Sequence, residues 1–143
     1  MRLGKTTVDS LVAAARAVRE HAFAPASNFR VGAAVLTKSG KVFVGCNVEN
    51  ASYGLTICAE RAAVCAMVAA GEREIVAVAV ATGTDRPTSP CGACRQVLFE
   101  FAPRRGSVQV VLAGTRPKAR MRSLDELLPD QFTMQDVRLG RGK

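Results

Sequence analysis

The sequence predicts a single α/β domain in which helices pack against a central β-sheet. Segments with helical spacing of apolar residues alternate along the chain with short runs rich in valine and alanine. The chain has 143 residues, a length that suits one domain with a sizeable core. Neither an internal repeat nor a linker-like stretch divides it. We therefore expect residues 1–143 to form one domain.

The amino-terminal third predicts one helix and two strands. Between Thr7 and His21 apolar residues recur at helical spacing, after threonines that can cap a helix. The stretch "FAPASNF" then interrupts the helix with a proline and turn residues. Residues 29–37 and 41–48 have the composition of strands, and "KSGK" between them is typical of a hairpin.

The middle of the chain predicts two helices on either side of a buried strand. After the polar loop "ENASYG", a helix is expected over residues 56–70, ended by Gly71. Residues 74–82, "EIVAVAVAT", form a nearly continuous apolar run, which is typical of a strand buried on both faces. Ser89 and Pro90 indicate a third helix, with the proline at its first helical position and the next proline beyond its end.

The last third predicts a strand over residues 107–114, a short helix over 123–128 and a final helical turn over 133–139. Ser123 and, three residues later, Glu126 have the spacing of a capping box. From about residue 133 onward the chain is basic, and we expect a solvated, frayed tail there.

The net charge of +8 raises the question of nucleic-acid binding, since basic residues neutralise phosphates. Much of the excess lies in "GTRPKARMRS" and "VRLGRGK", and no basic helix with interleaved aromatic residues occurs. We therefore interpret the charge as a solvated surface and consider nucleic acid an improbable partner. No secretory leader and no apolar run near 18 residues is recognisable, so a cytoplasmic protein without membrane contact is expected.

Cysteine usage points to metal binding or catalysis. The chain contains an odd number of cysteines without a secretory signal, a pattern more typical of a metal or catalytic site than of disulfides. They are Cys46, Cys58, Cys65, Cys91 and Cys94. We interpret Cys46 and Cys65 as small buried hydrophobic residues.

The other three cysteines occur at predicted helix starts. Cys58 and Glu60 are placed in the first turn of one helix, and Cys91 and Cys94 in the first turn of another. The positive end of a helix dipole favours thiolates, and a C-x-x-C at that end directs both sulfurs to one side. Three sulfurs fit tetrahedral zinc with the fourth position left for water, and Glu60 is placed to move that water's proton.

Three thiolates leave an excess of negative charge on a zinc ion. The two helix N-termini can offset it, and so can Arg61 through a hydrogen bond to a ligand sulfur. The alternative for Arg61 is an ordinary ion pair. For the cysteines, a redox pair or a closed four-cysteine zinc site that includes Cys46 also stays open at this point.

The pattern C-x-E followed by P-C-x-x-C is that of zinc deaminases with three cysteine ligands. With it, the chain resembles the small homotetrameric cytidine deaminases from about Val8 to about Phe132. The stretches that carry the resemblance are "SNFRVGAAVLT", "GCNVENASYGLTICAER", "SPCGACRQVLFEF" and "LLPDQF". The resemblance implies a three-layer α/β/α sandwich around a mixed five-stranded sheet. It also implies one Zn²⁺ per chain and a homotetramer with shared active sites.

The activity implied is hydrolytic deamination of cytidine and 2′-deoxycytidine to uridine and 2′-deoxyuridine, a step of pyrimidine salvage. Cys58, Cys91 and Cys94 correspond to the zinc ligands and Glu60 to the proton shuttle. The residues implied to bind substrate are Phe29 against the pyrimidine ring, Asn47 and Glu49 on the ribose hydroxyls, and the main chain of Ala59 and Ser89 at the base edge.

Neighbouring subunits are implied to contribute Ala51, Tyr53 and Phe132 to each site. The chain departs from the family pattern at Ala26, where a tyrosine is frequent, and at Arg30, where proline or lysine is frequent. Both positions flank the site, so they bear on substrate preference and loop rigidity and leave the reaction itself unaffected.

Two other functions remain as alternatives. One is a deaminase of another aminopyrimidine nucleoside such as blasticidin S, although the N-x-E pair with "ASYG" favours an ordinary nucleoside. The other is a non-catalytic module in which zinc stabilises a nucleic-acid-binding fold. Water beside Glu60 in the fourth zinc position indicates an enzyme, whereas a fourth protein sulfur indicates a structural site.

Overall fold

The computed structural model describes residues 2–103 and 107–141. Its elements in chain order are α1 (Lys5–Arg19), β1 (Val31–Thr37), β2 (Val42–Cys46), the 3₁₀ helix η1 (Tyr53–Leu55), α2 (Ala59–Ala69), β3 (Ile75–Thr82), α3 (Gly92–Glu100), β4 (Gln109–Ala113), β5 (Arg120–Ser123), α4 (Leu124–Leu127) and α5 (Met134–Gly140). Within the described part of the chain, none of the helices has both the length and the apolar character needed to cross a bilayer.

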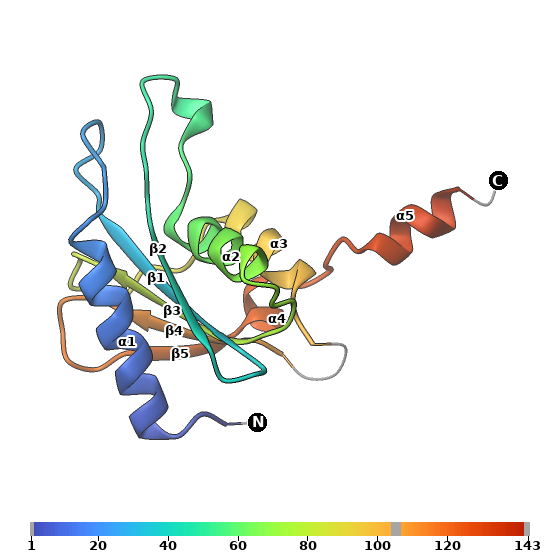
Figure 1. Ribbon diagram of the computed structural model, residues 1–143, viewed down its shortest axis with the longest axis horizontal. Helices are drawn as coiled ribbons and strands as arrows, with labels where there is room; N and C mark the ends of the chain where they lie inside the picture. Colours follow the sequence, from blue (N-terminus) through green and yellow to red (C-terminus); the bar gives the residue numbers. More distant parts are fainter. Residues whose placement is uncertain (1, 104–106, 142–143) are drawn as a thin grey trace.

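The five strands form one mixed sheet in the order β2-β1-β3-β4-β5. Strand β1 is antiparallel to both β2 and β3, so β2 and β3 run in the same direction. Strand β4 is parallel to β3, with α3 in the connection between them, and β5 is antiparallel to β4. Helix α1 lies on one face of the sheet and α2, α3 and α4 lie on the other (Figure 1). The predicted α/β class and the three-layer sandwich are both confirmed.

Strand β3 is buried on both faces because each face meets a helical layer. Its alanines pack with Leu11 and Ala15 of α1, whereas Val78 and Val80 pack with the layer that contains α2 and α3. The alternation of small and larger side chains follows from the two-residue period of a strand. The alanine face lets α1 lie close to the sheet, and the valine face fills the wider space beneath the other helices.

Two strand glycines permit close approach of the helices. A Cβ atom at Gly32 would lie 1.9 Å from the carbonyl oxygen of Ala15 in α1. At Gly45 of β2, a Cβ would lie 2.4 Å from the amide nitrogen of Ala63 and 2.5 Å from the carbonyl oxygen of Ala59. Both obstacles at Gly45 are backbone atoms of α2, so a substituted side chain cannot be accommodated by a rotamer change.

We predict that Gly45→Ala destabilises the protein by about 2–3 kcal/mol, because α2 must shift away from β2. For a chain of this length that corresponds to a fall of about 5 °C or more in the unfolding temperature. Differential scanning calorimetry measures it, with Gly54→Ala as a control because a Cβ at Gly54 meets nothing within 4 Å. Equal unfolding temperatures for the two variants would show that the α2–β2 contact is not tight.

The predicted helix starts differ from the observed ones. Helix α1 begins at Lys5 with Gly4 as N-cap, so the threonines expected to cap it lie inside its first turn. Helix α3 begins at Gly92, and Pro90 precedes its N-cap instead of occupying its first turn. The reason is that Cys91 is extended, with ψ 165°, and the first helical hydrogen bond runs from the Arg95 amide to the Cys91 carbonyl.

The strand predicted over residues 107–114 and the short helix predicted over 123–128 are confirmed as β4 and α4, and two other features of this part of the chain need correction. The capping box of Ser123 and Glu126 is present at the start of α4. Strand β5 was not predicted from the pattern, because its sequence "RMRS" is polar and it forms an edge of the sheet, where charged side chains remain solvated. The final helical turn predicted over residues 133–139 is confirmed as α5, which has its own capping box and projects from the sandwich, so the expectation of a frayed tail from residue 133 is wrong (Figure 1). The last two residues of the basic tail lie outside the described part.

The interpretation of Cys46 and Cys65 as buried is wrong for Cys65, which is exposed, whereas Cys46 is half-buried. The buried residues of α2 include Ala63, Val64 and Met67. Cys65 lies on the face of α2 that points away from the sheet, since each residue advances the helix by about 100°.

Candidate active site

The candidate site lies where two helices begin beside the sheet. Strands β2 and β3 run in the same direction, so their carboxyl ends lie at the same end of the sheet. The chain leaves β2 through η1 to enter α2, and leaves β3 through residues 83–91 to enter α3. Both helices therefore begin at this end of the sheet, which is where α/β proteins commonly bind ligands.

Three cysteine sulfurs come together at these helix starts. Cys58 is the N-cap of α2, Cys91 is the N-cap of α3, and Cys94 follows in the first turn of α3. Their sulfur atoms all lie within 4.8 Å of one another, and those of Cys58 and Cys91 are 3.9 Å apart. Among the described residues, this is the only group of three or more His, Cys, Asp or Glu side chains with such a geometry.

The geometry of the three sulfurs fits a zinc ion. Tetrahedral zinc with sulfur ligands at about 2.3 Å places those sulfurs about 3.8 Å apart, close to the Cys58–Cys91 separation. Neither Cys46 nor Cys65 belongs to the cluster within the described residues, so the closed four-cysteine site that includes Cys46 is not supported. Three sulfurs alone match a zinc site that keeps one position open for a reactant.

Arg61 lies against this sulfur cluster. Its guanidinium donates hydrogen bonds to the Cys58 sulfur at 3.5 Å and to the Thr56 carbonyl at 3.2 Å. The bond to Cys58 raises the pKa of the guanidinium, and nearby Cys94 acts in the same direction. No carboxylate forms an ion pair with Arg61 among the described residues, which disfavours the ordinary ion-pair interpretation.

Glu60 is the buried carboxyl group of the site. It lies in the first turn of α2 and is only 4% exposed. Burial raises the pKa of this carboxyl group above its ordinary value; hydrogen bonds with its own backbone amide and with Cys94, and the charge of Arg61, partly oppose this shift. A carboxyl group with a raised pKa next to a metal-binding cluster is suited to accept and release protons near neutral pH.

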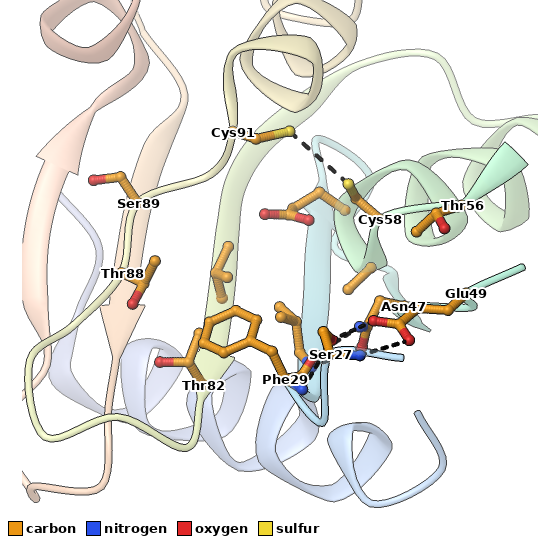
Figure 2. Close-up of a pocket in the computed structure, with 14 residues that line it drawn as sticks. Ser27, Phe29, Asn47, Glu49, Thr56, Cys58, Thr82, Thr88, Ser89 and Cys91 are labelled. Atoms are coloured by element: carbon orange, nitrogen blue, oxygen red, sulfur yellow. Dashed lines mark hydrogen bonds between the residues drawn. The ribbon is translucent and has the colours of Figure 1, made fainter. Parts of the chain in front are cut away.

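A cavity of about 300 Å³ lies in front of the sulfurs and Glu60. Its volume is at the lower end of the range for small-molecule sites. Its lining includes the predicted residues Phe29, Asn47, Glu49, Cys58, Ala59, Glu60, Ser89 and Cys91. Figure 2 shows the sulfurs of Cys58 and Cys91 on one side of this space and the Phe29 ring on the opposite side. A flat ring bound in this space would therefore contact Phe29 on one side and the cysteine sulfurs on the other.

Asn47 and Glu49, which follow β2, hold the loop that carries Phe29. The side-chain nitrogen of Asn47 donates a hydrogen bond to the backbone carbonyl of Phe29 at 2.8 Å, and its side-chain oxygen accepts one from the backbone amide of Val31 at 2.8 Å. The Glu49 carboxylate accepts hydrogen bonds from the amides of Ala26 and Ser27 at 2.7 and 3.2 Å, and from the Ser27 hydroxyl. These bonds, led by that of the Ser27 hydroxyl, lower the pKa of Glu49.

The structure does not bring Ala51, Tyr53 and Phe132 into the cavity of their own chain. Tyr53 is 78% exposed and Phe132 is 62% exposed. The segment with η1 and the segment with α5 both project from the sandwich (Figure 1). All three residues therefore lie away from the cavity of their own chain.

Sequence reasoning missed four polar side chains that line the cavity: Ser27, Thr56, Thr82 and Thr88. Ser27 could have been recognised as a turn residue whose hydroxyl bonds the main chain two residues on, as it does with Phe29. Arg95 was also missed. It donates to the carbonyls of Pro90 at 2.8 Å and Leu127 at 2.7 Å, and thereby fixes the loop that contains Cys91.

Comparison with known families gives one match over most of the chain. Residues 5–110 match the family described as "Cytidine and deoxycytidylate deaminase zinc-binding region". This range contains the three clustered cysteines and Glu60. Of the predicted site residues, only Phe132 lies outside it.

Individual relatives agree with this family. The chain is 46% identical to a cytidine deaminase of Halalkalibacterium halodurans over 127 residues, which cover 89% of this chain and 95% of the relative. It is 47% identical to a cytidine deaminase of Mycobacterium tuberculosis over 116 residues, covering 81% and 82%. A crystal structure of cytidine deaminase from Burkholderia pseudomallei superposes with a TM-score of 0.81 at 52% identity, covering 87% of this chain and 98% of the other.

Proposed function

Since the chain belongs to the cytidine and deoxycytidylate deaminase family, we propose that it deaminates cytidine and 2′-deoxycytidine to uridine and 2′-deoxyuridine by hydrolysis. The observation that carries the proposal is the cavity between Phe29 and the cluster of Cys58, Cys91 and Cys94, with Glu60 in its wall. It combines a surface for a flat base with a zinc site and a buried proton carrier.

The zinc ligands are Cys58, Cys91 and Cys94. When bound there, zinc supplies a Lewis acid that lowers the pKa of water and makes a nucleophile available at neutral pH. The thiolates lie at two helix N-termini, and Arg61 donates a hydrogen bond to one sulfur. These positive groups reduce the negative charge that three thiolates place on the site.

Glu60 carries the protons of the reaction. Its carboxylate takes a proton from the attacking water and passes it to ring nitrogen N3. It then takes the proton of the new hydroxyl group on C4 and delivers it to the amino group, which leaves as ammonia while the C4 carbonyl forms. Its burial supports this role, because desolvation raises the pKa of the carboxyl group and makes its carboxylate a stronger proton acceptor than an exposed one.

The remaining cavity residues orient the substrate. Phe29 packs against the pyrimidine ring, and Asn47 and Glu49 reach the ribose hydroxyls. The main chain of Ala59 and Ser89 meets the polar edge of the base. All five residues line the same cavity, which supports their acting on one molecule.

The test is ultraviolet absorbance of cytidine and 2′-deoxycytidine incubated with the zinc-loaded protein. We expect the cytosine band to disappear with both nucleosides. Deoxycytidylate and blasticidin S, run in parallel, serve as competing substrates. Turnover of one of these two without turnover of cytidine would replace the proposed substrate, and no turnover of any of the four would favour the structural-zinc alternative.

We further propose a homotetramer in which neighbours contribute Ala51, Tyr53 and Phe132 to each site. The support is the exposure of Tyr53, Leu55 and Phe132, which are large apolar side chains on segments that project from the sandwich. Sedimentation velocity of the active protein is the measurement. A fully active monomer would show that each chain has a complete site of its own.

A role in pyrimidine salvage, in a cytoplasmic setting, completes the proposal. The product uridine can re-enter nucleotide pools, and three free thiols are needed for the metal, a state that a reducing compartment maintains. The check uses a strain that cannot make pyrimidines and receives cytidine as its only pyrimidine source. We expect growth only when this protein is expressed. Growth without it would mean that another enzyme suffices.

A further inference from the structure

Three hydrogen bonds hold the Glu49 carboxylate to the loop between α1 and β1. One carboxylate oxygen, Oε2, accepts the amides of Ala26 and Ser27 at 2.7 and 3.2 Å. The other, Oε1, accepts the hydroxyl of Ser27. A carboxylate offers about four acceptor positions, so one position, on Oε1, remains for a ligand.

The Ser27 hydroxyl also connects Glu49 to the aromatic wall of the cavity. While it donates to Glu49, its oxygen accepts a hydrogen bond from the Phe29 amide at 3.0 Å. Asn28 between them takes the left-handed conformation with φ 54°, and its amide donates to the Ala24 carbonyl at 2.9 Å. The loop is thus a tight turn, and the Ser27 hydroxyl connects the Glu49 carboxylate with the backbone of Phe29.

Asn47 is engaged with the same loop from the other side. One amide hydrogen and one carbonyl lone pair of its side chain are used on the backbone of Phe29 and Val31. This residue is 8% exposed, so much of its surface is covered. Glu49, half-buried and lining the cavity, has the freer acceptor of the pair.

We propose that Ser27 is a positioning residue for sugar recognition, which orients Glu49 so that its one open acceptor position receives a single hydroxyl group of the nucleoside sugar. The inference rests on the proposed function. Because the Ser27 hydroxyl also accepts a hydrogen bond from the Phe29 amide, it fixes the position of the Glu49 carboxylate relative to the backbone that carries the Phe29 ring. The hydroxyl concerned is one that cytidine and 2′-deoxycytidine share, at the 3′ or the 5′ position.

Ser27→Ala tests this role through a separation of KM from kcat. We expect KM for cytidine to rise about tenfold, the worth of one well-placed hydrogen bond, while kcat stays within about twofold. Ser27→Thr keeps the hydroxyl and should keep KM near that of the wild type. Ser10→Ala, at an exposed serine of α1, is the matched control. The unfolding temperature should change little, since Ser27 lies in an exposed loop.

Sugar analogues identify the hydroxyl that Glu49 receives. With 2′,3′-dideoxycytidine or with 5′-deoxycytidine, whichever lacks that hydroxyl, Ser27→Ala should leave KM unchanged. A rise of equal size with cytidine and with both analogues would overturn the inference, because the effect would not pass through a sugar hydroxyl.

A double-mutant cycle with Glu49→Gln checks the route. If Ser27 acts through Glu49, the tenfold effect of Ser27→Ala should shrink to about twofold or less in the Glu49→Gln background. An unreduced effect, or an unchanged KM in Ser27→Ala itself, would overturn the proposal. A wild type that deaminates no cytidine would instead overturn the proposed function, and the inference with it.

Discussion

Glu60→Gln is expected to lower kcat for cytidine by on the order of 10⁴-fold while the zinc content stays the same. Glutamine has nearly the volume of glutamate, so the buried site should keep its packing. It can neither take the proton from water nor deliver one to ring nitrogen N3. Because the three sulfurs are untouched, metal binding should persist. Steady-state kinetics together with zinc analysis of the same preparation measure both quantities.

The control for this variant is Glu100→Gln, which makes the same chemical change at an exposed residue at the end of α3. Its kcat should equal that of the wild type. Substrate affinity should survive in Glu60→Gln, since Phe29 and Glu49 line other parts of the cavity. A Glu60→Gln variant with more than a tenth of the wild-type kcat would remove Glu60 from its proposed role.

Cys94→Ala is expected to abolish both zinc binding and deamination. Cys94 is fully buried in the first turn of α3, and burial raises the pKa of its thiol in the absence of a metal. A bound zinc ion compensates for a buried thiolate at this position. A zinc ion that binds only the folded state stabilises it by about 4 kcal/mol when the free zinc concentration is about 1,000 times the Kd, and this stabilisation is lost with the site. The unfolding temperature should then fall by about 10 °C.

Two other cysteine variants make this test specific. Cys65→Ala alters an exposed thiol and Cys46→Ala a half-buried one, and neither belongs to the sulfur cluster. Both should retain one zinc per chain and wild-type turnover. Zinc analysis and calorimetry of the three variants together decide the ligand set. Zinc lost from Cys46→Ala, with zinc kept in Cys94→Ala, would contradict the assignment of the ligands.

The strands and helices of the core were predictable because burial imposes either a periodic pattern or a continuous apolar run on the sequence. The run over residues 74–82 indicated a strand covered on both faces, and β3 is that strand. The capping box at Ser123 was predictable because its two hydrogen bonds join residues three apart. Strand β5 was not predicted, since a four-residue edge strand with two arginines shows no hydrophobic period.

By itself, the sequence determined the chemistry of this protein. The spacing of Cys58, Glu60, Cys91 and Cys94 indicated a three-sulfur metal site with a proton carrier, because ligand type and helix starts are local properties. Only the tertiary structure decided that β2 and β3 point the same way and so bring the starts of α2 and α3 to one edge.

The tertiary structure also decided how the sugar-binding residues are used. In the sequence, Ser27 and Glu49 are 22 residues apart, and no local rule connects them. Their hydrogen bonds exist because the loop after α1 folds back over the end of β2, a contact set by packing of the whole sheet. Long-range contacts of this kind depend on strand order and direction, which the pattern of residues in one chain segment does not contain.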